Sequence, residues 1–221
     1  MGAMTETSET KSIDPVAAKE TGRLEAFSDG VFGIALTLLV LELKVPHPDA
    51  AAGARTSGAL WNSLGQEWPS YFAYATSFIS ILIMWMHHHT VFKLVQKTDS
   101  LLLFANGFLL LVVTVVPFPT AVLADYLMTS AAPAACMFYA GTFVIISSAY
   151  CLLVIAAFRP KMLSPNASAA KVTQLRKSYW LGPPLYLTAL IVAAFNVWIC
   201  IGICTCLWIF WAITIMDSCE N

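Results

Sequence analysis

The chain has 221 residues, of which 58% are hydrophobic and only 11% are charged, and its formal net charge is -1. Soluble domains carry about 25% charged residues, so this composition excludes an ordinary soluble domain and indicates a protein that crosses the lipid bilayer several times. The near-zero net charge offers nothing to attract a polyanion, and we expect no nucleic-acid partner.

The apolar residues fall into long runs. A helix needs about 20 predominantly apolar residues to cross the hydrocarbon core. Four runs have that length, at residues 24–43, 69–92, about 100–117 and about 134–158. The last run, 179–216, is too long for one helix and accommodates two with a turn near Asn196. The sequence therefore predicts an all-α polytopic membrane protein with six transmembrane helices.

Helix breakers lie at or near the ends of these runs. They are Gly22, Pro46, Pro48, Pro117, Pro119, Pro133, Pro160, Pro165, Pro183 and Pro184. We expect the PFPT segment to close the third helix. Three parts are predicted: a polar cytoplasmic tail at 1–22 without a cleavable signal peptide, a six-helix transmembrane domain at 23–216, and a short C-terminal tail at 217–221.

Basic residues are concentrated on one side of the predicted topology. Loops on the cytoplasmic side of a membrane carry an excess of Lys and Arg. On that side lie Lys11, Lys19, Arg23, Lys93, Lys97, Arg159, Lys161, Lys171, Arg176 and Lys177. Only Lys44 and Arg55 lie on the other. Both termini are therefore predicted to be cytoplasmic, which agrees with an even number of helices.

The first apolar run, RLEAFSDGVFGIALTLLVLEL, has two different faces. At about 100° per residue, one face carries Ile34, Thr37, Leu38 and Leu41. The other side carries Asp29, Gly33, Leu36 and Val40. One face is thus made of branched hydrophobic residues with a single threonine, and the other holds a carboxylate.

An ionisable residue within a membrane helix has a function or a partner. Arg23 is six residues from Asp29, so the two do not face each other on one helix. The second helix ends and the third begins on the side where the first enters. We therefore expect one hydrogen-bonded layer formed by Arg23, Ser28, Asp29, one of the histidines His87, His88 and His89, and Asn106. A structural clasp is the favoured interpretation, with a proton relay or gate as the alternative.

Three consecutive histidines invite a zinc interpretation. Successive residues of a helix point in different directions, so three in a row do not converge on one metal ion. A pH-sensing role stays open, because histidine titrates near neutrality. The trio Cys200, Cys204 and Cys206 lacks CxxC spacing. We expect no metal site and no cofactor.

The residues RLEAFSD fit the pattern Arg-x-x-x-Phe-Ser-Asp, in which Phe27 precedes Ser28 and Asp29. This pattern resembles the start of the first transmembrane helix in the lysosomal potassium channel family, transmembrane protein 175, and its bacterial relatives. The stretches WMHHHTVF and NGFLLLVVTVVPFPT are also similar to that family. The resemblance covers residues 20–120, and beyond them it extends only to the hydrophobic outline.

The resemblance implies a potassium-selective channel and not an enzyme. The chain carries a single six-helix repeat, which implies a homotetramer in a bacterial plasma membrane with helix one lining a central pore. Ile34 would form the narrowest ring, Leu38 and Leu41 further rings, and Thr37 an ion-coordinating position. Glu42, next to the outermost ring, would concentrate cations at the pore mouth. The TVGYG filter of ordinary potassium channels does not occur in the sequence.

Three other classes of function are kept as alternatives. A proton-coupled secondary transporter would use Asp29 as its coupling site, and broken helices or an inverted repeat would be expected. A membrane enzyme would need a nucleophile with a base, and no such motif accompanies the histidines. A passive helix bundle without transport is the third.

Overall fold

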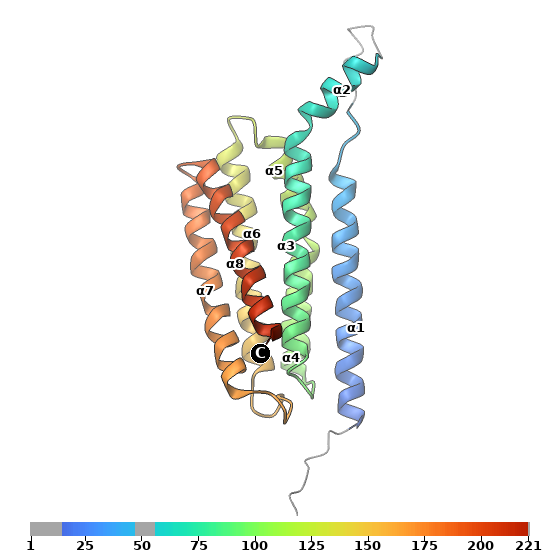
Figure 1. Ribbon diagram of the computed structural model, residues 1–221, viewed down its shortest axis with the longest axis vertical. Helices are drawn as coiled ribbons and strands as arrows, with labels where there is room; N and C mark the ends of the chain where they lie inside the picture. The colour runs from blue at the N-terminus through green and yellow to red at the C-terminus, as the bar shows by residue number, and fades with distance from the viewer. Residues whose placement is uncertain (1–14, 47–55, 221) are drawn as a thin grey trace, which may run out of the picture.

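The computed structural model describes residues 15–46 and 56–220, and its elements are helices (Figure 1). They are α1 (Pro15–Leu38), the 3-10 helix η1 (Leu39–Glu42), α2 (Ser57–Gln66), α3 (Trp68–Phe92), α4 (Ser100–Thr114), α5 (Pro117–Tyr126), α6 (Ala132–Ala157), α7 (Ala169–Ala193) and α8 (Val197–Glu220). The all-α prediction is confirmed.

Five helical segments of the described chain are long and apolar enough to cross a membrane. They are Lys19–Glu42, Trp68–Phe92, Ser100–Tyr126, Ala132–Ala157 and Val197–Met216. The first, second and fourth follow predicted runs to within five residues at each end. The third continues to Tyr126 instead of ending at residue 117, and the fifth covers only the second half of the run 179–216. The predicted turn near Asn196 is also present, because the Asn196 side-chain oxygen accepts a hydrogen bond from the backbone N–H of Ile199 (3.0 Å) at the start of α8.

Helix α7 begins at Ala169, within a segment that the sequence analysis assigned to a loop. Pro183 and Pro184 lie inside this helix, so their prediction as a boundary is wrong. Pro183 has no N–H to donate to the carbonyl of Tyr179. The Cys151 thiol on α6 donates to that carbonyl instead (3.2 Å), which compensates for the lost bond. A neighbouring helix thus makes the proline tolerable, and a single-helix pattern does not contain that information.

The PFPT segment does not end the third span. Pro117 starts α5, and the span continues to Tyr126. A proline in the first turn of a helix costs no helical hydrogen bond. Between α4 and α5 the backbone N–H groups of Val115 and Val116 bond to carbonyls three residues earlier, at 3.3 and 3.1 Å. The hydrogen-bond pattern therefore changes at the prolines, but the span does not end there.

Three further boundaries differ from expectation. Helix α1 starts at Pro15, inside the segment expected as a tail, and α8 continues to Glu220. Helix α2 was not predicted. The Thr56 hydroxyl oxygen accepts a hydrogen bond from the N–H of Ala59 (3.2 Å) and caps its start.

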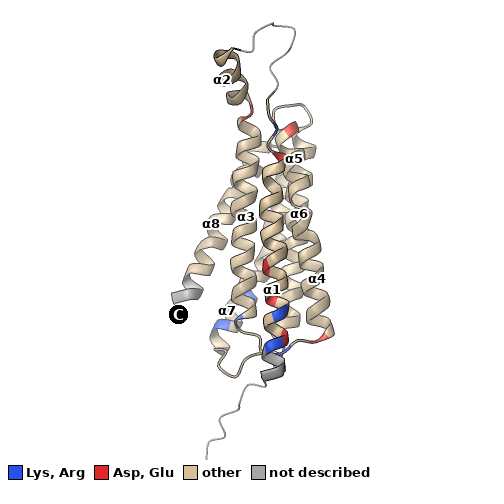
Figure 2. Ribbon diagram, turned by 90° about the vertical axis from the view of Figure 1, so that its right-hand side faces the viewer, with Lys and Arg blue, Asp and Glu red and all other residues tan. Residues whose placement is uncertain are grey.

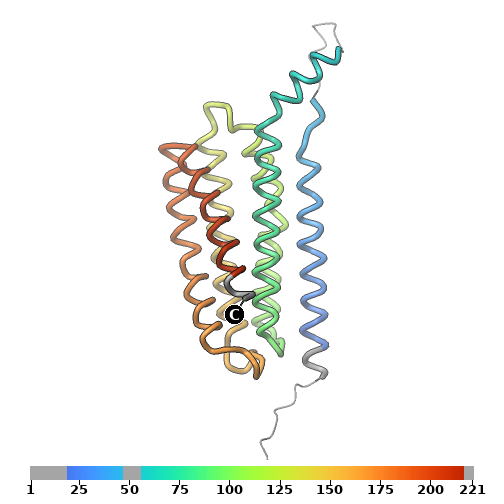
Figure 3. The backbone as a smooth tube through the Cα atoms, in the orientation of Figure 1, coloured from blue at the N-terminus to red at the C-terminus, as the bar shows by residue number. Residues whose placement is uncertain are grey.

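Helix α6 lies in the centre of the bundle and α1 at its edge (Figures 1 and 3). Over the most apolar 18 residues of each helix, 61% of the α6 residues are buried but only 22% of the α1 residues. Helix α1 packs on α3 and α4. One long side of α1 is therefore left without a neighbour in the single chain.

Lys and Arg gather at the end of the bundle where α1 and α7 begin (Figure 2). There the Arg159 guanidinium lies 2.6 Å from the carboxylate of Asp99 and lowers the pKa of that carboxyl. At the opposite end Lys44 lies 2.6 Å from Asp125, and this hydrogen bond raises the pKa of the lysine. The two ion pairs lie at opposite ends of the bundle.

Candidate pore helix and the contacts behind it

Helix α1 presents one face to the bundle and another away from it. Ser28, Phe32, Ala35 and Leu39 are buried, at the spacing of four and three residues that places them on one side of a helix. Opposite them lies a set that we call the outer stripe. It consists of Arg23, Phe27, Gly30, Ile34, Thr37, Leu38 and Leu41, all of them exposed.

The outer stripe contains the whole face that the helical periodicity selected. Ile34 is 57% exposed and Leu41 is 72% exposed, although both are large apolar residues. Leu36 is half-buried and packs against the core. Gly33 and Val40, which the periodicity places on the other side together with Asp29, are exposed as well. The bundle contacts α1 on the side of Ser28 and Phe32, about a quarter turn from the centre of that expected group.

Two polar residues lie close to the apolar positions of the outer stripe, Thr37 among them and Glu42 next to Leu41. The Thr37 hydroxyl donates a hydrogen bond to the carbonyl of Ile34 (2.9 Å). Its proton is thereby fixed on the helix, and the oxygen keeps acceptor capacity for an ion or a water molecule. Glu42 is half-buried at the end of η1. The oxygen atoms of both side chains can attract a passing cation.

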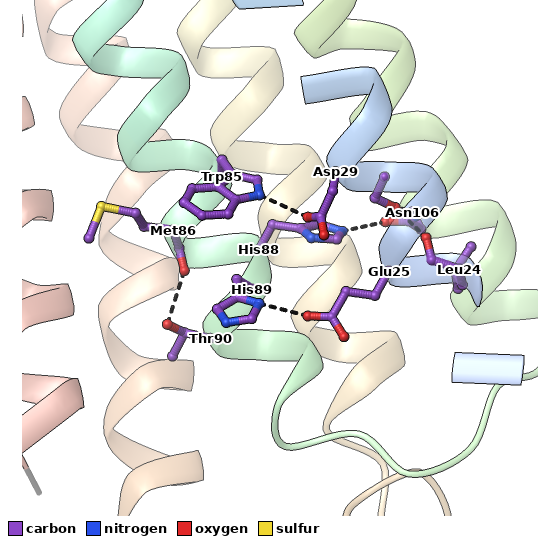
Figure 4. Close-up of polar contacts among 10 residues, drawn as sticks. Leu24, Glu25, Asp29, Trp85, Met86, His88, His89, Thr90 and Asn106 are labelled. Carbon is purple, nitrogen blue, oxygen red and sulfur yellow. Dashed lines mark hydrogen bonds and ion pairs between the residues drawn. The ribbon is translucent and has the colours of Figure 1, made fainter. Parts of the chain in front are cut away.

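Behind this face, α1 and α3 are joined by two polar contacts one helical turn apart (Figure 4). The Trp85 indole N–H donates to the Asp29 carboxylate (2.8 Å). The His89 ring nitrogen Nδ1 lies 2.7 Å from the Glu25 carboxylate. The rings of Trp85 and His89 stack on each other, with centroids 5.9 Å apart. The two helices are thus fixed in register at two successive turns.

A second set of hydrogen bonds reaches from α3 through α4 to α1. The Ser28 hydroxyl donates to the carbonyl of Leu24 (2.9 Å), so its oxygen accepts from the Asn106 amide N–H (2.9 Å). The Asn106 carbonyl oxygen then accepts from His88 Nε2 (2.8 Å). The proton of a neutral His88 is therefore on Nε2, and Nδ1 is buried without a partner.

His87 points away from α1. Its Nε2 donates to the backbone carbonyl of Trp211 (3.1 Å), and its Nδ1 accepts from the Tyr179 hydroxyl (3.0 Å). The three histidines therefore point to different parts of the structure and share no partner, as the helical geometry requires. No cluster of three or more His, Cys, Asp or Glu side chains that could hold a metal occurs in residues 15–46 and 56–220.

The observed contacts agree with one part of the expected polar layer and differ from it elsewhere. Ser28, His88 and Asn106 are brought together. Asp29 instead accepts from Trp85, and the structure adds the pair Glu25–His89. Arg23 and Phe27 lie on the outer stripe, and Arg23 contacts neither Asp29 nor another described acceptor.

One sequence signal could have located Glu25 and Trp85. Glu25 and Asp29 are four residues apart, as are Trp85 and His89, so each pair lies on one face of its helix. Because α1 and α3 run antiparallel, two such pairs can meet as two rungs.

Comparisons with known proteins confirm the resemblance. Residues 23–117 match the family described as "Endosomal/lysosomal potassium channel TMEM175". The chain is 47% identical to a potassium channel of Chamaesiphon minutus over 202 residues, covering 91% of this chain and 98% of that protein. It is 55% identical to a potassium channel of Streptomyces collinus over 108 residues, covering 49% of this chain and 50% of that protein.

A solved structure has the same fold. It is the crystal structure of a lysosomal potassium-selective channel TMEM175 homolog from Chamaesiphon minutus, with a TM-score of 0.80 and 44% identity. It covers 89% of this chain and 98% of that one. An endosomal/lysosomal proton channel TMEM175 of Gallus gallus is 41% identical over 83 residues, which are 36% of this chain and 16% of that protein.

Proposed function

The chain belongs to the TMEM175 family of potassium channels, and from this membership we propose that it conducts potassium passively across a bacterial plasma membrane. It is a channel and not an enzyme. The observation that carries the proposal is the outer stripe of α1, which beyond Arg23 is apolar apart from Thr37 and has no neighbour in the single chain. A membrane helix exposes such a face either to lipid or to other copies.

The proposed channel is a homotetramer in which α1 from each copy lines the pore. Six helices cross the membrane, with α7 as the sixth, and both termini are cytoplasmic. The position of α7 supports this, because it packs along α6 and α8 (Figure 1). Along its exposed side, the basic residues Arg176 and Lys177 are followed by Trp180. Tryptophan prefers the membrane interface.

In this assembly Ile34, Leu38 and Leu41 form apolar rings, of which Ile34 is the narrowest. Thr37 offers its hydroxyl oxygen to a passing ion between the Ile34 and Leu41 rings. Glu42 concentrates cations at the outer mouth. The polar contacts of Glu25, Asp29 and Ser28 act as a clasp that holds α1 against α3 and α4. No cofactor is needed, and potassium is the permeant ion.

The decisive experiment is single-channel recording from purified protein in a planar bilayer. We expect unitary current steps whose reversal potential follows the potassium gradient. Steps distinguish a channel from a transporter, because a transporter cycle moves too few ions to resolve. Smooth currents without steps, or none in protein that has assembled, would contradict the proposal.

The role of Asp29 separates the channel from a proton-coupled transporter. Asp29→Asn removes the charge and keeps an oxygen that can accept from the Trp85 indole N–H. We expect the potassium current to stay within about twofold of wild type, since the hydrogen bond that holds α1 against α3 is kept. Potassium flux into proteoliposomes provides the measurement. Loss of flux with intact assembly would favour the transporter.

The proposed topology predicts opposite labelling at the two ends of the bundle. Met128 is exposed at the end of the bundle that carries Lys44. Lys161 is exposed at the opposite, basic end. In intact cells, Met128→Cys should react with an impermeant thiol reagent. Lys161→Cys should react only after permeabilisation, and the unsubstituted chain is the control for native thiols. The reverse labelling pattern would mean that the protein has the opposite orientation in the membrane.

A further inference from the structure

Helix α2 carries an apolar stripe that nothing in the single chain covers. Trp61 is 73% exposed and Leu60 is 46% exposed, while Leu64 is half-buried on the same side. We call Leu60, Trp61 and Leu64 the α2 stripe. The other side of the helix carries Asn62, Ser63 and Gln66, and no residue from Ser57 to Gln66 is charged. A helix of this kind is amphipathic and needs an apolar surface to lie on.

The direction of α2 is set where it meets α3. Pro69 has no N–H to donate to the carbonyl of Gly65, so the helical bonding is interrupted there and the chain bends. Beyond the bend α2 leaves the end of the bundle and leans towards the side where α1 is the outermost helix (Figure 1). Helix α2, which carries the α2 stripe, therefore extends from the bundle on the side where α1 presents its outer stripe.

Helix α2 extends beyond the end of the bundle, and charged groups lie at that end (Figure 2). The ion pair of Lys44 with Asp125 lies at this end of the bundle. Glu67, which accepts a hydrogen bond from Ser70, separates α2 from the membrane-spanning α3. An indole as exposed as Trp61 is unfavourable in water. Lipid surrounds the outside of a channel, whereas α2 leans towards the side of α1 proposed to face the pore.

We propose that α2 packs on the α2 helices of neighbouring subunits and forms an uncharged collar over the outer mouth of the pore. The partner is therefore a second copy of this chain, which contributes its own Trp61 to the contact. This inference rests on the proposed tetramer with α1 at its axis. It adds an aqueous contact between subunits beyond the membrane.

Cysteine cross-linking tests the contact directly. Trp61→Cys should yield covalent dimers on mild oxidation in native membranes. Gln66→Cys, exposed on the other side of the same helix, should yield at least fivefold less, and the unsubstituted chain corrects for native cysteines. Leu41→Cys reports assembly through α1. Cross-linking at Leu41 but not at Trp61 overturns the collar alone, whereas failure at both overturns the assembly.

Conduction supplies a second test that does not depend on a disulfide. At about 0.01 M ionic strength charges act over about 30 Å. If α2 lies over the pore mouth, Trp61→Glu should raise the unitary potassium current and Trp61→Lys should lower it, about twofold each. The same charges at Met128, exposed at the same end on the α5–α6 turn, should change it little. Equal effects at both positions, or none at Trp61, would place α2 away from the mouth.

Discussion

Ile34→Asn is expected to raise the potassium current about tenfold or more and to weaken the discrimination between potassium and sodium. A ring of four isoleucines offers an ion no ligand, and water itself is unfavourable in a narrow apolar ring. Keeping one such side chain from water is worth about 1.5–3 kcal/mol. Asparagine has a similar size and binds water. A barrier lower by about 1.4 kcal/mol gives a tenfold higher rate, so wetting the ring should have a large effect.

Leu36→Asn is the matched control for this prediction. Leu36 lies on the same helix, two residues away, but it is half-buried against the bundle and not on the outer stripe. The substitution should leave unitary current and ion selectivity near wild type, at some cost in stability. Single-channel recording of both variants in the same bilayer compares them. An equal rise in current in Leu36→Asn would mean that the wrong face of α1 was assigned to the pore. No rise in current in either variant would mean that α1 does not line the pore.

The apolar runs were sufficient to predict most of the architecture. Run length and hydrophobicity determine which segments can cross the membrane, and a turn residue such as Asn196 marks where one long run must divide. The proline positions were less informative. Pro117 starts a helix and Pro183 lies inside one, because the energetic cost of a proline depends on which carbonyl loses its donor. At Tyr179 the Cys151 thiol on another helix makes up for that loss.

The outer stripe was predictable because it depends only on the period of one helix. The partners behind it were not, because they depend on the register between helices. Asn106 and His88 were placed at the right depth by the topology alone. The choice of Trp85 as the donor to Asp29, and of Glu25 as the partner of His89, follows from how α1 and α3 are rotated and aligned. Periodicity within one helix does not contain that rotation.

The second large effect is expected at Asn106, which links three helices. Asn106→Leu keeps the size of the side chain but removes both hydrogen bonds, to Ser28 and from His88. Both ring nitrogens of His88 are then without a partner, since Nδ1 already lacks one. Interhelical hydrogen bonds in membranes contribute about 0.6 kcal/mol on average and up to about 1.7, and an unsatisfied buried group costs about 1–3 kcal/mol. We expect the free energy of unfolding to fall by about 2–3 kcal/mol, measured by denaturant titration in detergent.

The double variant His88→Phe with Asn106→Leu separates a structural clasp from a proton relay or gate. It replaces both partners with apolar groups of similar shape, which can be nearly neutral for stability. A phenyl ring at position 88 would also fit beside Phe32 and Phe92, which already pack against the imidazole. If the contact is a clasp, the double variant should regain most of the lost stability and conduct potassium like wild type. If stability returns but current does not, the polar atoms themselves are needed for conduction, and the clasp interpretation is wrong.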